Sequence, residues 1–155
     1  MKKFIFISLL LISCSSNMSV NISEPIINKE YSYDDVSTMI EFEDIFNQIE
    51  EDYLIYFFST TCGHCEALKQ DIISFYSLNI ITIYFVDCTN KDVYGNKKDL
   101  TGVFSLEEFY IFGTPFLINI ISGVIDNYYY GVSQIKEYIS SKISINQIEW
   151  DILIC

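Results

Sequence analysis

The chain has 155 residues, of which 50% are hydrophobic and 16% aromatic, and its formal net charge at pH 7 is −12. This length gives room for one domain with a sizeable core, and the high apolar content excludes a disordered chain. The negative charge argues against nucleic acid as a partner and gives no attraction to anionic lipid surfaces.

The chain begins with the pattern of an export signal. In "MKKFIFISLLLISC", two lysines precede the apolar run Phe4–Ile12, which is too short to span a bilayer but fits the core of a signal peptide. Leu11–Cys14 resembles a bacterial lipobox. Residues 1–13 are therefore predicted to be a lipoprotein signal peptide, with Cys14 as the lipidated first residue of the mature chain. An ordinary signal peptide with a chance cysteine is the alternative, and a buried N-terminal strand is disfavoured because a polar tail follows.

Such a protein would be anchored by lipid to a bacterial cell membrane on its extracytoplasmic face, where disulfides persist. Residues 14–33 are mostly polar, contain Pro25 and show no sustained period, which predicts a flexible tether. Residues 34–155 are then the folded domain, and their cysteines are to be considered as redox groups.

From residue 37 onward, strand and helix patterns alternate. In chain order they predict a short strand at Ser37–Ile40, a helix at about 41–51, a buried strand at Tyr53–Ser59, a helix from the cysteine pair to about Leu78, a buried strand at Ile80–Val86, a polar loop at Cys88–Gly102, a short helix from Ser105 through Tyr110, a hairpin turning at Ser122-Gly123, and a last helix through Val132, Ile135 and Ile139. Because the hairpin requires an antiparallel pair, the order predicts an α/β domain with a central mixed β-sheet and helices on both faces. Ser144–Cys155 is apolar enough to pack but is not assigned.

The only histidine lies between two cysteines in the order Cys62-Gly63-His64-Cys65. Cys62 ends a buried strand and starts a helix, where unpaired backbone N–H groups and the helix dipole stabilise a thiolate. A fall in its pKa from about 8.5 to about 7 raises the thiolate fraction at pH 7 from roughly 3% to roughly half. Cys65 follows one turn later on the buried face, and His64 adds a polar group near the Cys62 sulfur. This spacing suits thiol–disulfide exchange in which Cys62 attacks and Cys65 resolves, and a stabilised reduced form makes the disulfide a stronger oxidant.

Two simpler interpretations of the cysteine pair are less favoured. A structural zinc site needs four ligands, and this chain offers one CxxC with no second pair. A purely structural disulfide that closes so short a loop constrains the unfolded chain little. A reactive dithiol without a metal is therefore the preferred interpretation.

The segment "IFGTPF" places Pro115 at the start of a hairpin strand, where proline is tolerated. Together with the strand–CxxC–helix pattern, the hairpin and the last helix, it resembles the thioredoxin superfamily over about residues 36–143. The CGHC sequence itself is similar to the active sites of protein disulfide isomerases. The resemblance implies a thioredoxin-like fold with Cys62, Gly63, His64 and Cys65 as the catalytic motif. It further implies that Pro115 is cis and lies against the dithiol, and that the backbone of Thr114 pairs with an extended substrate segment.

Several positions depart from the family pattern. Tyr56 occupies the place of a buried acid that is thought to help deprotonate the second cysteine, and Ile83 replaces a lysine often paired with that acid. Thr61 stands where a tryptophan is usual, and the loop Cys88–Gly102 is longer than in plain thioredoxin. A Tyr56 hydroxyl or water could take the place of the acid, or resolution could be slow.

Two further cysteines remain open. Cys88 at the end of a strand is expected to be a small buried apolar residue, with pairing to Cys155 or a redox role as minor alternatives.

The resemblance implies a thiol–disulfide oxidoreductase on the oxidising or isomerising side, with the redox-active disulfide Cys62–Cys65 and no other cofactor, and the signal sequence places it outside the cytoplasm. Expected partners are exported proteins with cysteines and an unidentified redox partner, the membrane is reached through the lipid on Cys14, and the chain is expected to be a monomer. A reductase of exported thiols is one alternative. A lipoprotein binding module that holds Cys62–Cys65 as a static bond is the other.

Overall fold

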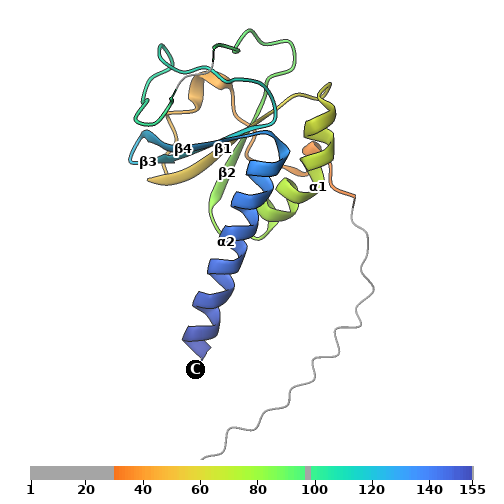
Figure 1. Ribbon diagram of the computed structural model, residues 1–155, viewed down its shortest axis with the longest axis vertical. Coiled ribbons are helices and arrows are strands. Elements are labelled where there is room, and N and C mark those ends of the chain that lie inside the picture. The colour runs from red at the N-terminus through yellow and green to blue at the C-terminus, as the bar shows by residue number, and fades with distance from the viewer. Residues whose placement is uncertain (1–29, 97–98, 155) are drawn as a thin grey trace, which may run out of the picture.

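Four strands form one mixed sheet in the order β2-β1-β3-β4 in the computed structural model, which describes residues 30–96 and 99–154, with side chains through residue 148. The predicted lipidation site Cys14 lies outside the described residues, as does Cys155. The elements in chain order are η1 (Tyr33–Asp35), η2 (Phe42–Asp44), β1 (Asp52–Phe58), α1 (Gly63–Ser77), β2 (Thr82–Asp87), β3 (Phe116–Ile121), β4 (Val124–Tyr130) and α2 (Gly131–Ile154) (Figure 1).

The apolar run of β1 explains its central place in the sheet, because all but its first residue are buried. β1 pairs in parallel with β2 and antiparallel with β3, so that Tyr56 lies between Phe85 and Leu117. β3 continues into β4 through a tight turn, in which Ser122 and Gly123 have φ angles of 52° and 80°. A hairpin turn that needs positive φ at both central residues favours glycine, which matches the prediction of a hairpin here.

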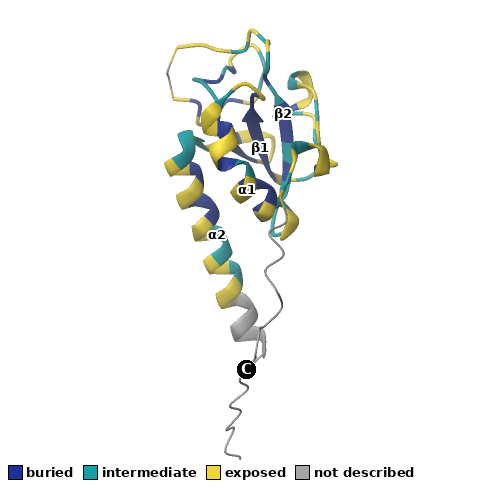
Figure 2. Ribbon diagram, turned by 90° about the vertical axis from the view of Figure 1, so that its right-hand side faces the viewer, coloured by how far each residue is buried: buried dark blue, intermediate teal, exposed yellow. Residues whose placement is uncertain are grey.

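Alternate side chains of β1 enter two separate cores. Leu54, Tyr56 and Phe58 join the core beneath α1 and α2, which we call the helix face. Tyr53, Ile55 and Phe57 point the other way, into a core covered by η2 and irregular segments around residues 100–112, which we call the loop face. Figure 2 shows β1 in the dark blue of buried residues. The predicted thioredoxin-like mixed sheet with packed helices is confirmed. The expectation of helices on both faces is wrong in detail: α1 and α2 both cover the helix face, and among the described residues the loop face is covered by the 3-10 turn η2 and irregular segments.

α1 has the predicted helical face and ends close to the predicted residue. Its buried side chains are those of Cys65, Leu68, Ile72, Ile73 and Phe75. Asn79, just after the helix, adopts a left-handed conformation with φ of 52°, which stops helical hydrogen bonding. Both α1 and α2 lie on the helix face, side by side (Figure 1).

The α-helix predicted over 41–51 is wrong, since only the 3-10 turn η2 forms there. Two carbonyls of this segment accept hydrogen bonds from side chains. The Gln48 amide donates to the Asp44 carbonyl at 2.7 Å, and the Tyr53 hydroxyl donates to the Ile45 carbonyl at 3.0 Å. Ile49, counted as part of the apolar face, is 95% exposed.

The short helix predicted from Ser105 through Tyr110 is also wrong. Successive turns occupy this segment, with Glu108 donating to the Ser105 carbonyl and Phe109 to the Leu106 carbonyl. The strand predicted at Ser37–Ile40 is reduced to a single bridge, in which Met39 pairs with Phe85 beside β2.

α2 extends further than its predicted core, and the unassigned C-terminal stretch continues it to Ile154. Beyond Ile143 the helix leaves the sheet, and Ile145 and Ile148 are exposed (Figure 1). Among the described residues, none of the helices combines the length and apolar character that a membrane span requires.

Candidate active site

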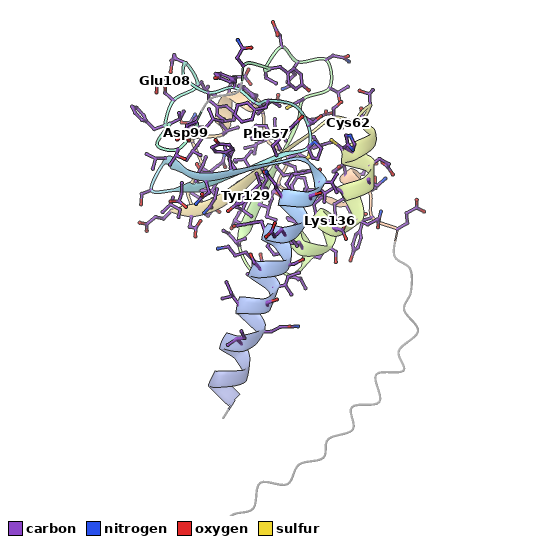
Figure 3. The ribbon with its side chains drawn as sticks, viewed as in Figure 1. Phe57, Cys62, Asp99, Glu108, Tyr129 and Lys136 are labelled. Carbon is purple, nitrogen blue, oxygen red and sulfur yellow. The ribbon has the colours of Figure 1, made fainter. Side chains whose placement is uncertain are left out.

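The predicted dithiol lies where β1 gives way to α1. Cys62 is the N-cap residue of α1, and its sulfur accepts a hydrogen bond from the backbone N–H of Cys65 at 3.3 Å. Its own backbone N–H donates to the Ser59 carbonyl at 3.1 Å, which fixes the turn out of the strand. Figure 3 shows Cys62 at the first turn of α1. The positive end of the helix dipole lies next to the sulfur of an N-cap residue, so this position stabilises a thiolate.

Thr114, one of the two predicted substrate-binding residues, contacts the dithiol although it is 52 positions from Cys62 in sequence. The Thr114–Pro115 peptide bond is cis, as the resemblance implies. The Cys62 thiol donates to the Thr114 carbonyl at 3.2 Å, while the Pro115 carbonyl accepts from Gly131 at 3.0 Å. The fold therefore brings Cys62, Cys65 and the Thr114–Pro115 backbone together.

The two thiols of the pair have opposite electrostatic surroundings. Partial burial on its own would raise the pKa of the Cys62 thiol, but hydrogen bonding from the Cys65 thiol, the Thr114 side chain and nearby backbone N–H groups outweighs it and lowers that pKa. Cys65 is fully buried, and burial together with its hydrogen bond to Cys62 raises the pKa of its thiol to about 12. One reactive sulfur at the surface and one protonated sulfur behind it follow from this arrangement.

The two middle residues of the motif are both exposed. The backbone N–H of His64 is among the groups that lower the pKa of Cys62. A side chain added at Gly63 would meet nothing within 4 Å. The role predicted for the His64 side chain stays a prediction.

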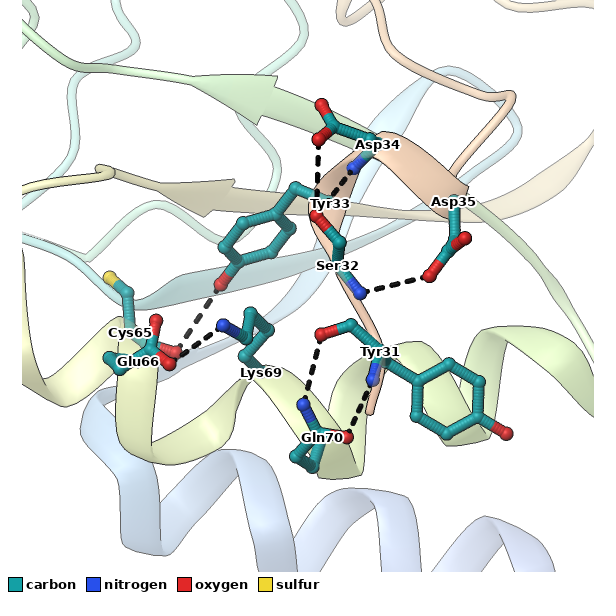
Figure 4. Close-up of polar contacts among 9 residues, drawn as sticks. All are labelled: Tyr31, Ser32, Tyr33, Asp34, Asp35, Cys65, Glu66, Lys69 and Gln70. Atoms are coloured by element: carbon teal, nitrogen blue, oxygen red, sulfur yellow. Dashed lines mark hydrogen bonds and ion pairs between the residues drawn. The ribbon is translucent and has the colours of Figure 1, made fainter. Parts of the chain in front are cut away.

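Tyr56 occupies the inner side of the site, where the resemblance would place an acid. The residue is fully buried, and among the described residues its hydroxyl has no partner in hydrogen-bond geometry. Tyr33 covers it from the N-terminal segment: its ring stacks on Phe58 with centroids 3.8 Å apart, and its hydroxyl donates to the Cys65 carbonyl at 3.3 Å (Figure 4). Sequence reasoning missed Tyr33, which falls in the predicted tether and carries no periodic signal.

Tyr94 is a second residue that sequence reasoning missed. It belongs to the long loop after β2, where it pairs with Ile111 in an isolated bridge. Burial raises the pKa of its hydroxyl, which also interacts with the Thr114 side chain and with the thiols of Cys62 and Cys65. The loop after β2 therefore adds an aromatic side chain, about half exposed, near Thr114.

Cys88 is 1% exposed and lies in the loop-face core, as predicted for a small buried residue. Burial raises the pKa of its thiol to about 12, so it is poorly suited to exchange. Within the part of the chain that the structure describes, no group of three or more histidine, cysteine, aspartate or glutamate side chains is arranged to hold a metal ion.

Comparison with known proteins gives one consistent result. The family model of thioredoxin matches residues 35–124. Similar solved structures include the thioredoxin of Plasmodium falciparum, with a TM-score of 0.49 and 16% identity over 67% of this chain and 97% of that one. Another is the thioredoxin of Malassezia sympodialis, with a TM-score of 0.49 and 18% identity over 67% of this chain and 88% of that one. Mitochondrial thioredoxin 3 of Saccharomyces cerevisiae has a TM-score of 0.48 and 14% identity over 67% and 93% of the two chains. No curated protein matches the chain.

Proposed function

The chain belongs to the thioredoxin family, and from that premise we propose that it is a thiol–disulfide oxidoreductase acting on exported proteins through Cys62 and Cys65. The observation that carries the proposal is the asymmetry of the pair. Cys62 is partly exposed with a lowered pKa, and Cys65 is fully buried with a raised one. Exchange uses both properties, because one sulfur must be a thiolate to attack a client and the other must stay protonated until the mixed disulfide has formed.

In the reducing direction, the Cys62 thiolate attacks one sulfur of a client disulfide, and the second client sulfur leaves as a thiolate. The product is a mixed disulfide between Cys62 and the client. Cys65 then loses its proton and attacks the Cys62 sulfur, which releases the client thiolate and leaves the Cys62–Cys65 disulfide. Two electrons pass from the protein to the client. The same steps run backward when the oxidised pair accepts electrons from client thiols.

The Thr114 backbone is proposed to hold the client beside the dithiol. Its carbonyl already accepts the Cys62 thiol at 3.2 Å, so a client strand aligned with this segment would present its sulfur to Cys62. Tyr94, whose hydroxyl interacts with the Thr114 side chain, would lie near that client strand. Backbone pairing of this kind recognises an extended segment with little dependence on its sequence.

The direction of exchange is proposed to be oxidising or isomerising. Every interaction that lowers the pKa of Cys62 stabilises the reduced state, which makes the disulfide a stronger oxidant. The neutral side chain of Tyr56 adds no negative charge behind the thiolate. We expect a reduction potential nearer to about −180 mV, as in protein disulfide isomerase, than to about −270 mV, as in thioredoxin.

The place of action is proposed to be the extracytoplasmic face of a bacterial membrane, with Cys14 lipidated and residues 14–33 as the tether. The support is the "LLISC" sequence after an apolar run. Cys14→Ser should abolish incorporation of labelled fatty acid and release the protein from the membrane fraction. Retention of the label in this variant would contradict the anchor.

The exchange proposal is tested by capture of clients with Cys65→Ser. This variant should accumulate mixed disulfides through Cys62, because the resolving sulfur is gone. Cys62→Ser is the matched control and should capture none. Equilibration of the native pair against glutathione buffers gives the potential in the same preparation. A potential near −270 mV would support a reductase, and a pair that never exchanges would leave a static disulfide on a binding module.

A further inference from the structure

A buried serine follows directly after β1, three positions before the reactive cysteine. Ser59 is 7% exposed, and a buried hydroxyl costs stability unless it is hydrogen-bonded. Its oxygen accepts from the Thr61 backbone N–H at 3.3 Å and lies 3.0 Å from the Thr61 hydroxyl. On its other side it lies 3.2 Å from the Thr89 hydroxyl. The Ser59 side chain therefore joins the turn before Cys62 to the chain that follows β2.

Thr89 continues the pairing of β1 with β2 beyond the last residues of the two strands. The register ends at Phe58 and Asp87, and the Cys88 backbone N–H then donates to the Phe58 carbonyl at 2.7 Å. Beyond this bond, the Thr60 backbone N–H donates to the side-chain oxygen of Thr89 at 2.9 Å, and the two threonine hydroxyls lie 3.1 Å apart. A side chain thus holds the two chains together where the backbone ladder ends.

Asp87 fixes the orientation of Thr89. Its Oδ1 accepts from the backbone N–H of Thr89 at 2.8 Å and from the hydroxyl at 2.5 Å. Hydrogen bonds to a carboxylate are roughly twice as strong as those between neutral groups, so this bond holds the single hydroxyl proton and leaves the Thr89 oxygen as acceptor for the Thr60 N–H. Lys91, which lines the same cavity as Asp87, is paired with Glu41 at 2.7 Å.

Ser59 acts on both cysteines through its backbone. Its carbonyl accepts the backbone N–H of Cys62 at 3.1 Å. Burial raises the pKa of the Cys65 thiol to about 12, and hydrogen bonding from the Ser59 backbone N–H opposes that rise. A displacement of Ser59 would therefore change the surroundings of both sulfurs.

We propose that Asp87 and Thr89 are positioning residues for the dithiol, which act through Ser59 by clamping the turn between β1 and α1. The proposal rests on the proposed exchange function and deepens it. The clamp keeps Cys62 at the N-cap of α1, where its sulfur accepts the Cys65 backbone N–H at 3.3 Å. When the clamp is opened, the turn moves and this hydrogen bond weakens. The Cys62 thiolate then loses part of its stabilisation, because the helix terminus no longer points at the sulfur.

The chain offers a matched control in a second Asp-x-Thr turn. There the Oδ1 of Asp99 accepts from the Thr101 backbone N–H at 2.9 Å. The next residue, Gly102, donates to the Ile125 carbonyl at the start of β4. The start of β4 lies beside the end of β3, at the opposite end of the hairpin from the contact between Thr114 and the dithiol. Thr101→Val thus removes a threonine hydroxyl from the same kind of turn without touching the clamp.

The test measures the reactivity of Cys62 as a function of pH. The reduced full chain is alkylated with iodoacetamide between about pH 5 and pH 9, and modification at Cys62 is followed by mass spectrometry. Thr89→Val keeps the shape of the side chain and removes its hydroxyl. It should raise the pKa of the Cys62 thiol and lower the alkylation rate at neutral pH by roughly threefold to tenfold, the change in an equilibrium that one hydrogen bond produces. Ser59→Ala opens the clamp from its other side and should have the same effect.

Thr89→Ser keeps the hydroxyl and should match the native chain, as should Thr101→Val. Circular dichroism of each variant shows that it is folded, and Ser59→Ala decides the matter if Thr89→Val does not fold. A Cys62 profile unchanged by opening the clamp would overturn the proposal, as would an equal change in Thr89→Ser or Thr101→Val. A native chain that forms no mixed disulfide with oxidised glutathione would instead overturn the exchange function.

Discussion

The two faces of the sheet are built by different means. On the helix face, α1 and α2 present side chains at regular spacing to β1, and the dithiol belongs to the first turn of α1. On the loop face, rings from η2 and irregular segments pack on the same strand, with Phe109 contacting Phe42, Phe46 and Phe57. Both faces are well filled, so tight burial does not require regular structure. Regular structure is needed to aim a hydrogen-bonding helix terminus at a sulfur.

If the helices of the helix face adjust less than the irregular segments of the loop face, removing one buried ring from each face should cost different amounts of stability. Phe75 in α1 is 2% exposed and Phe109 is 6% exposed. Phe75→Ala should lower the free energy of unfolding by about 4–5 kcal/mol, because a helix cannot move in to fill the cavity, and Phe109→Ala by about 3 kcal/mol, because a loop partly can. Urea unfolding of the reduced protein measures both. A larger loss at Phe109 would reverse the comparison.

Two glycines, one in the loop after β2 and one in the first turn of α1, should differ in the stability that replacement by alanine costs. A Cβ at Gly95 would lie 2.4 Å from the Tyr110 ring, in a segment where Gly95 donates to the Ile111 carbonyl. Gly95→Ala should therefore cost about 1–3 kcal/mol as the loop shifts. At Gly63, with nothing within 4 Å, the same change should stay within about 0.5 kcal/mol. The midpoints of urea unfolding give both values, and equal costs would show that the loop yields freely.

The same contrast separates what the sequence could predict from what it could not. β1 and α1 were predictable because an apolar run and a helical period are local signals. The dithiol and Pro115 were predictable because a motif marks them. The helix expected over 41–51 does not form, and the contacts found there instead, from the Gln48 and Tyr53 side chains to backbone carbonyls, leave no trace in a helical period.

The residues of the site that sequence reasoning missed are all held by long-range contacts. Tyr33 reaches Cys65 across 32 positions, from a segment whose composition predicts a tether. Tyr94 is placed by its bridge to Ile111, within a loop that has no period. Only the folded arrangement shows that Tyr33 contacts Cys65 and that Tyr94 lies near Thr114.

Each face also buries one thiol, and alkaline pH should reveal both. Burial raises the pKa of Cys65 on the helix face and of Cys88 on the loop face to about 12, so the unfolded chain ionises these groups first. Their stabilisation is complete below a pH of about 9 and is lost as pH rises from there toward 12. The lowered pKa of Cys62 has the opposite effect. Its contribution to stability grows as pH rises toward the pKa of the thiol in the unfolded chain and stays constant above it.

Between pH 8 and 10 each buried thiol should cost about 1.4 kcal/mol of stability in the reduced protein. Cys88→Ala should remove one such contribution from the pH dependence, and Cys65→Ala should remove another. Urea unfolding across this range is the measurement. A pH dependence of stability that neither variant changes would mean that the two thiols have the same pKa in the folded and the unfolded chain.

The smallest contrast concerns two tyrosines on one strand that face opposite ways. Tyr53 on the loop face donates to the Ile45 carbonyl at 3.0 Å, so Tyr53→Phe leaves a buried carbonyl without its donor and should cost about 1 kcal/mol. Tyr56 on the helix face has no partner in hydrogen-bond geometry among the described residues, so Tyr56→Phe should be neutral or stabilise the protein by up to about 1 kcal/mol. Unfolding of the two variants under identical reducing conditions measures the difference. Stability gained at Tyr56 would show that the helix-face core carries a hydroxyl that costs it stability, whereas a loss equal to that at Tyr53 would show that the hydroxyl serves the core.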